Sequence, residues 1–138
     1  MTTNFKKIKR KTHITSIVSY PVYPAKMGGQ KGIACFYSAF SKLVPVTMVS
    51  TKNNGIPEQL NAEFLPIINE NKSRYYNPLL FITLKKIINK NKSSHVILEH
   101  PYLGWLGLLL KWFCNVKLVI HSHNIESLRF KSKLNPGL

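Results

Sequence analysis

Residues 96–120 read VILEHPYLGWLGLLLKWFCNVKLVI, a pattern that predicts a strand, a helix and a second strand in close succession. Residues 96–98 and 117–120 are predicted strands, because each contains a short apolar run that is typical of a buried strand. Residues 103–113 lie between them and form a largely apolar segment of helical length. Parallel neighbouring strands cannot be joined by a tight turn, so this order favours a parallel pair with a helical crossover.

The N-terminal part of the chain shows the same alternation. Residues 14–20 and 46–51 are predicted strands, and a helix that ends before Pro45 is predicted between them. Its apolar stripe, at steps of three and four residues, consists of Ile33, Phe36, Tyr37, Phe40 and Leu43. The first strand, this helix and the second strand form a second strand-helix-strand unit.

Residues 64–68 are a short apolar run, interrupted by Pro66, that predicts a third strand. Asn77 and Pro78 then supply a preferred cap and a first-turn proline for a helix. The full order of elements predicts an α/β fold with a doubly wound, Rossmann-like parallel sheet. A further helix is predicted over residues 124–130. Because such a sheet usually has more strands on that side, we expect the chain to be an incomplete piece of a larger protein.

Composition limits the class of protein. The chain has 138 residues, of which 44% are hydrophobic, enough for one domain with a real core. It carries 20 Lys and Arg against 5 acidic residues, all of them Glu, for a net charge of +15. This excess fits either a solvated lysine-rich surface or a polyanionic or membrane partner. We divide the chain into a basic leader, residues 1–12, and a domain, residues 13–138.

The apolar segments and cysteines exclude several classes. No signal peptide is recognisable, and residues 103–113 are about half the ~20 residues that a membrane span needs. We expect this segment to be a core helix rather than a surface anchor. Cys35 and Cys114 lack the spacing of a disulfide scaffold or a zinc finger, and we expect both to be buried thiols.

A glycine cluster precedes the first predicted helix. Gly28, Gly29 and Gly32 would let backbone N–H groups approach a phosphate at the positive end of that helix. They do not form a dinucleotide fingerprint, because seven residues separate Gly28 from Tyr20 and no acidic residue lies near Ser50. A long loop with an anion-binding tip and a simple turn before the helix both fit this pattern.

Titratable side chains follow two predicted strands. His100 lies just after one strand, and His121, His123, Asn124 and Glu126 follow the last one. The carboxyl ends of parallel strands are where such sheets bind ligands. With no Asp in the chain, hydrogen bonding to sugar hydroxyls or a phosphate is favoured over a metal site. Asn124 and Glu126 also fit a helix start, and His121 also fits a packing role.

Three segments together, residues 28–33, 96–100 and 118–126, resemble in order the N-terminal domain of glycosyltransferase family 4. The resemblance implies the GT-B fold, in which two Rossmann-like domains face each other across a cleft. It further implies retaining transfer of a sugar from a nucleotide-sugar donor to a glycan or lipid-linked acceptor, without a metal or other cofactor.

The resemblance also implies roles for individual residues. His123 would be the catalytic residue near the reacting sugar. Gly28 and Gly29 would lie on the loop near the donor diphosphate, where Lys31 could add charge although the family does not fix that position. The acceptor cleft would hold His121, Asn124, Glu126 and His100.

The chain departs from this family in lacking the C-terminal, donor-binding domain. We therefore expect the fragment alone to be inactive. The basic leader and the apolar helix suggest a cytoplasmic location, peripheral on the inner face of the plasma membrane. The alternatives are a basic nucleic-acid-binding module, which only the charge supports, and a truncated product without function.

Overall fold

The computed structural model describes residues 12–57 and 59–122, and in this part of the chain five strands form a single sheet in the order β3-β2-β1-β4-β5. Every neighbouring pair of strands is parallel. The strands are β1 (Ile14–Val18), β2 (Val46–Thr51), β3 (Glu63–Ile68), β4 (His95–Glu99) and β5 (Lys117–His121). The predicted α/β class with a doubly wound parallel sheet is therefore confirmed.

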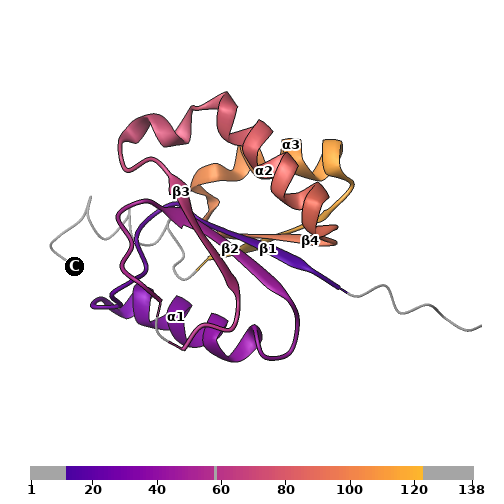
Figure 1. The fold of residues 1–138 in the computed structure, drawn as a ribbon. Coiled ribbons are helices and arrows are strands. Elements are labelled where there is room, and N and C mark those ends of the chain that lie inside the picture. Colours follow the sequence, from indigo (N-terminus) through magenta and orange to yellow (C-terminus); the bar gives the residue numbers. More distant parts are fainter. Residues whose placement is uncertain (1–11, 58, 123–138) are drawn as a thin grey trace, which may run out of the picture.

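Helices cover both faces of the sheet (Figure 1). One face carries α1 (Gly28–Phe40), which connects β1 to β2. The other face carries α2 (Pro78–Asn91) and α3 (Gly104–Cys114), which lead into β4 and β5. Short 3-10 helices, η1 (Lys72–Tyr75) and η2 (Pro101–Leu103), precede α2 and α3. The chain runs outward from β1 in one direction and then from β4 in the other, so the topological switch point lies between β1 and β4.

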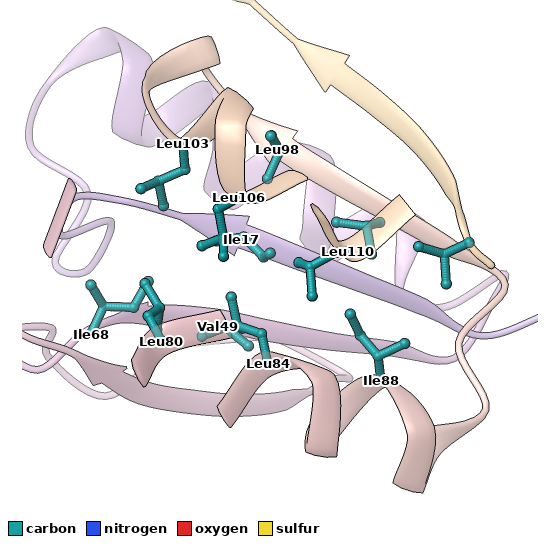
Figure 2. Close-up of a cluster of buried hydrophobic side chains, with 12 residues drawn as sticks. Ile17, Val49, Ile68, Leu80, Leu84, Ile88, Leu98, Leu103, Leu106 and Leu110 are labelled. Atoms are coloured by element: carbon teal, nitrogen blue, oxygen red, sulfur yellow. The ribbon is translucent and has the colours of Figure 1, made fainter. Parts of the chain in front are cut away.

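Each face of the sheet has its own apolar core. The core under α2 and α3 (Figure 2) joins Ile17, Val49 and Leu98 of the strands to the inner sides of the two helices. The core under α1 includes Val18, Met48 and other side chains packed around Ile33 and Tyr37. The central strands β1, β2 and β4 are almost entirely buried, whereas the edge strands β3 and β5 are mostly exposed or half-buried. Strands buried on both faces show no strict alternation of apolar and polar residues, as in the predicted strands 14–20, 46–51 and 96–98.

A glycine sets how closely α3 approaches the sheet. A Cβ placed on Gly107 would lie 2.7 Å from Cδ1 of Leu98 and 3.0 Å from Cδ1 of Leu118. Those two leucines belong to β4 and β5. The missing side chain therefore lets the helix lie directly on the two strands that end at the candidate site.

The glycine cluster lies in a helix and not in the loop before it. Because α1 begins at Gly28, Gly28 and Gly29 form its first turn. The Gln30 side chain closes this end: its Oε1 accepts the backbone N–H groups of Lys26 and Met27, both at 2.9 Å. Its Nε2 donates to the carbonyl of Pro21. The preceding loop is thus fixed to the helix end by a side chain that the glycine pattern did not indicate.

Two expectations about α1, for Leu43 and for Cys35, are wrong for different geometric reasons. The helix ends at Phe40, so Leu43 lies beyond it and is 81% exposed. Cys35 is exposed, whereas Cys114 is half-buried. Position 35 lies two residues from both Ile33 and Tyr37, the buried residues of α1, and a two-residue step turns about 200° around a helix. The thiol therefore points away from the core.

Three further expectations concern a membrane span, the segment 103–113 and a helix over residues 124–130. No helix in residues 12–57 and 59–122 is both long and apolar enough to cross a bilayer. The segment 103–113 is a core helix on its inner side, as expected, but its outer side is exposed. The helix predicted over residues 124–130 lies outside the described residues.

Candidate functional site

Three strands end at the same level beside the switch point. Val18 of β1 pairs with Glu99 of β4, and Glu99 pairs with His121 of β5. Just past the end of β1, the hydroxyl of Ser19 is 2% exposed and has no hydrogen-bond partner within the described part of the chain. The carboxyl edge of the sheet therefore gathers polar groups where open α/β sheets bind ligands.

A buried carboxylate is the centre of this edge. Glu99 is only 1% exposed, and its Oε1 accepts a 2.6 Å hydrogen bond from the hydroxyl of Tyr37. Its Oε2 lies 3.1 Å from Nδ1 of His121. An ionised carboxylate is stable at such a depth only when charge-assisted hydrogen bonds or an opposite charge replace water. The contacts tie α1, β4 and β5 together, and we call these three residues the Glu99 cluster.

His121 is the member of the cluster that reaches solvent. Its side chain is 40% exposed, and its ring centroid lies 5.5 Å from that of Phe36 on α1. The nitrogen Nδ1 of His121 faces the buried carboxylate of Glu99, and this contact fixes the orientation of the imidazole ring. A histidine held in this way can exchange hydrogen bonds with a bound ligand in a defined direction.

The phenols near Glu99 remain protonated. Burial raises the pKa of Tyr37, and the charge of Glu99 together with the hydrogen bond to it raises that pKa further. Burial, with smaller effects of Glu99 and Tyr102, raises the pKa of Tyr20 to about 12. Near neutral pH Tyr37 is therefore a neutral donor to the carboxylate.

His100 has a backbone conformation that L residues rarely adopt. Its φ is 78° and its ψ is 153°, in a region populated almost only by glycine. Its backbone N–H donates to the carbonyl of His121 at 3.0 Å. Its ring centroid lies 5.5 Å from those of Tyr20 and Tyr102. Strain of this kind costs on the order of 1–3 kcal/mol and gathers at functional sites.

This strain can be measured with two substitutions at position 100. His100→Ala and His100→Gly both remove the ring, but alanine keeps the unfavourable φ whereas glycine tolerates it. We expect His100→Gly to be more stable than His100→Ala by about 1–2 kcal/mol, although glycine normally destabilises a chain relative to alanine. Urea unfolding of both variants measures the difference. An alanine variant at least as stable as the glycine variant would mean that position 100 is not strained.

The structure places some of the predicted site residues and not others. His100 and His121 lie on neighbouring strand ends, as expected. Gly28, Gly29 and Lys31 are exposed in the first turn of α1. Three more predicted residues lie outside the described part, and nothing tests their roles: His123, Asn124 and Glu126. Within residues 12–57 and 59–122, no three metal-binding side chains come together.

Two residues of the Glu99 cluster were not assigned to the site from the sequence. Tyr37 was predicted to be part of an apolar stripe, because a tyrosine at a buried helical position gives no sign of where its hydroxyl points. Glu99 carried a usable signal, since an acidic residue that ends an otherwise apolar strand needs a buried partner. That signal identifies the carboxylate but not the helix that supplies its donor.

Comparison with known proteins finds similarity to an uncharacterized protein. No family model matches the chain. Over 106 residues the chain is 29% identical to an uncharacterized protein of Dickeya dadantii (strain 3937). The alignment covers 72% of this chain and 31% of that protein. The chain thus spans less than a third of the length of the curated relative it matches.

Proposed function

We propose that this chain is the N-terminal, acceptor-side domain of a retaining glycosyltransferase with the GT-B architecture. The enzyme would move a sugar from a nucleotide-sugar donor to a glycan or lipid-linked acceptor. The observation that carries the proposal is the Glu99 cluster, in which a buried carboxylate holds a half-exposed imidazole at the carboxyl ends of β4 and β5. This edge borders the switch point, where a cleft-facing site is expected.

The chemistry of sugar transfer suits these groups. An imidazole fixed through Nδ1 can orient a sugar hydroxyl by hydrogen bonding. A leaving diphosphate needs positive charge and N–H donors rather than a covalent partner. The first turn of α1 offers exposed N–H groups at Gly28 and Gly29 and the ammonium of Lys31. In this proposal His123 acts at the reacting sugar, while Asn124 and Glu126 complete the acceptor side together with His100.

A second domain is part of the proposal. The donor nucleotide would be held mainly by a C-terminal Rossmann-like domain, and the 31% coverage of the relative is compatible with a longer parent protein. We expect the isolated domain to have no transfer activity. The proposed location is cytoplasmic and peripheral, on the inner face of the plasma membrane, where a lipid-linked acceptor is accessible.

The test is a transfer assay on the full-length gene product that contains this domain, with a panel of radiolabelled nucleotide-sugars and membrane lipid extract as acceptor. We expect transfer with at least one donor. His123→Ala should lower kcat/KM at least about hundredfold, and His121→Ala about ten- to hundredfold. Lys42→Ala, at an exposed residue between α1 and β2 on the amino side of the strands, is the matched control and should retain activity. Transfer that survives His123→Ala would refute the site, and no transfer from any donor would refute the function.

A further inference from the structure

The outer side of α3 is apolar and exposed. Its inner residues Leu106, Gly107 and Leu110 are buried against the sheet. On the opposite side Trp105, Leu108 and Trp112 are 38%, 45% and 71% exposed. Steps of three and four residues place these three side chains on one line along the helix. A helix that packs only against its own sheet would carry polar residues there.

The exposed apolar surface continues around α3 and onto α2, which lies beside α3 on the same face of the sheet (Figure 1). Phe113 is 63% exposed and packs edge-to-face against Phe81 of α2. On α2 itself, Ile82 is 50% exposed. Exposed apolar groups gathered on one surface mark interaction sites. We call this surface the aromatic face: Ile82, Trp105, Leu108, Trp112 and Phe113.

Only positive charge accompanies this surface. The two helices together contain no acidic residue. They carry four lysines: Lys85, Lys86, Lys90 and Lys111. The ammonium of Lys85 lies 5.8 Å from the ring centroid of Phe113, so cation and aromatic ring share the same patch.

A basic hollow adjoins the C-terminal end of the aromatic face. Its volume is about 1320 Å³, and it lies at the amino ends of the strands. Trp112 and Lys111 line it together with Lys92, Lys117 and His95. Trp112 therefore belongs both to the apolar line of α3 and to a cavity in which three lysines can meet an anionic group.

We propose that the aromatic face docks on the surface of an anionic phospholipid membrane, with a lipid phosphate in the basic hollow. Indole rings favour the headgroup region, aliphatic and phenyl groups enter the boundary with the acyl chains, and lysines attract anionic lipids. A second copy of the chain fits poorly, because each copy carries a net charge of +15. A nucleic acid would leave the aliphatic side chains Ile82 and Leu108 without a stacking partner.

Docking in this way also orients the candidate site. The N-terminal end of α3 follows His100 through η2, at the carboxyl edge of the sheet, and its C-terminal end lies beside the basic hollow. The Glu99 cluster contacts Tyr37 and Phe36 of α1, on the other face of the sheet. A membrane along the outer side of α3 would therefore leave the cluster on the side that faces away from the lipid. That a lipid-linked acceptor reaches the cluster around the carboxyl edge of the sheet rests on the proposed function, whereas docking itself does not.

The experiment is co-sedimentation of the 138-residue chain with vesicles of phosphatidylcholine, with and without phosphatidylglycerol. We expect the basic leader, residues 1–12, to attract anionic vesicles by its charge alone. The test therefore uses variants that remove apolar side chains and leave the net charge unchanged. We expect binding only when phosphatidylglycerol is present, and Trp112→Ala combined with Leu108→Ser should lower the partition coefficient about tenfold or more. Leu43→Ser, also at an exposed apolar residue but beyond the end of α1, should bind like the wild type.

Each outcome decides the proposal. The double variant should remain folded at the temperature of the binding assay, because both side chains are exposed and their truncation leaves no cavity. A melting curve checks this, so lost binding would not reflect unfolding. Equal binding of the double variant and the wild type would overturn docking through the aromatic face. Binding to an oligonucleotide but not to anionic vesicles would also overturn it, in favour of a nucleic-acid partner. Docking without sugar transfer in the full-length protein would support the membrane surface and count against the proposed function.

Discussion

Leu106→Ala is expected to lower the free energy of unfolding by about 2–5 kcal/mol. Leu106 is fully buried in the core under α3, together with Ile17, Leu98 and Leu110 (Figure 2). Truncation removes apolar surface from this core and leaves a cavity that the sheet and two helices can close only in part. Because these residues connect α3 to β1 and β4, the loss should appear as one cooperative unfolding transition at lower urea concentration.

Leu108→Ala is the matched control for this prediction. It makes the same chemical change two residues further along the same helix, at a side chain that is 45% exposed. We expect a loss below about 1 kcal/mol, because solvent already surrounds much of the leucine and no cavity is formed. Urea unfolding followed by circular dichroism gives both values from the midpoint and the m-value. Equal losses for the two variants would contradict the assignment of an inner and an outer side to α3.

The order of strands and helices was predictable because it depends on local pattern. Strands of a parallel sheet that are buried on both faces leave continuous apolar runs, and helices between them leave stripes. The outer side of α3 could not be identified in this way. A helix that is apolar on all sides has no contrast that separates core positions from exposed ones, so Trp105 and Trp112 resembled core residues.

The positions of His100 and His121 at neighbouring strand ends were predictable, but their contacts were not. His100 and His121 were predicted to lie together because both follow apolar strands, and parallel strands end at one edge. The donor to Glu99 comes from Tyr37, 62 residues earlier in the chain, and no local pattern reports such a contact. The positive φ of His100 was equally hidden, because nothing in the residues around it required a glycine-like conformation. The catalytic role of His123 stays a prediction.

Raising the pH above about 10 is expected to destabilise the fold through its buried phenols, and Tyr37→Phe is expected to reduce that dependence. The reference pKa of tyrosine is 10.0, and the pKa of Tyr37 in the folded chain is higher, first through burial and then through Glu99. The raised pKa of Tyr20, about 12, acts in the same direction. Burial also raises the pKa of Tyr23.

The sign follows from proton binding. Between the unfolded and folded pKa values, the unfolded chain releases the phenolic proton while the folded chain retains it. The stabilisation is therefore complete below the unfolded pKa and is lost as the pH rises. Each retained proton lowers the free energy of unfolding by about 1.4 kcal/mol per pH unit. For the fully buried Tyr37 the loss reaches about 2–3 kcal/mol two units above the reference value.

The slope against pH isolates the contribution of Tyr37. Tyr37→Phe also removes the hydrogen bond to Glu99, which lowers stability at neutral pH by about 1.5–3 kcal/mol, so absolute values mix two effects. Above about pH 10 the free energy of unfolding of the variant should fall less steeply with pH than that of the wild type. The difference in slope should correspond to about one bound proton, and urea unfolding at several pH values measures it. Tyr76→Phe, at an 80% exposed tyrosine, should keep the wild-type slope. A slope unchanged by Tyr37→Phe would show that the Tyr37 hydroxyl is not the buried donor that fixes Glu99 beneath His121.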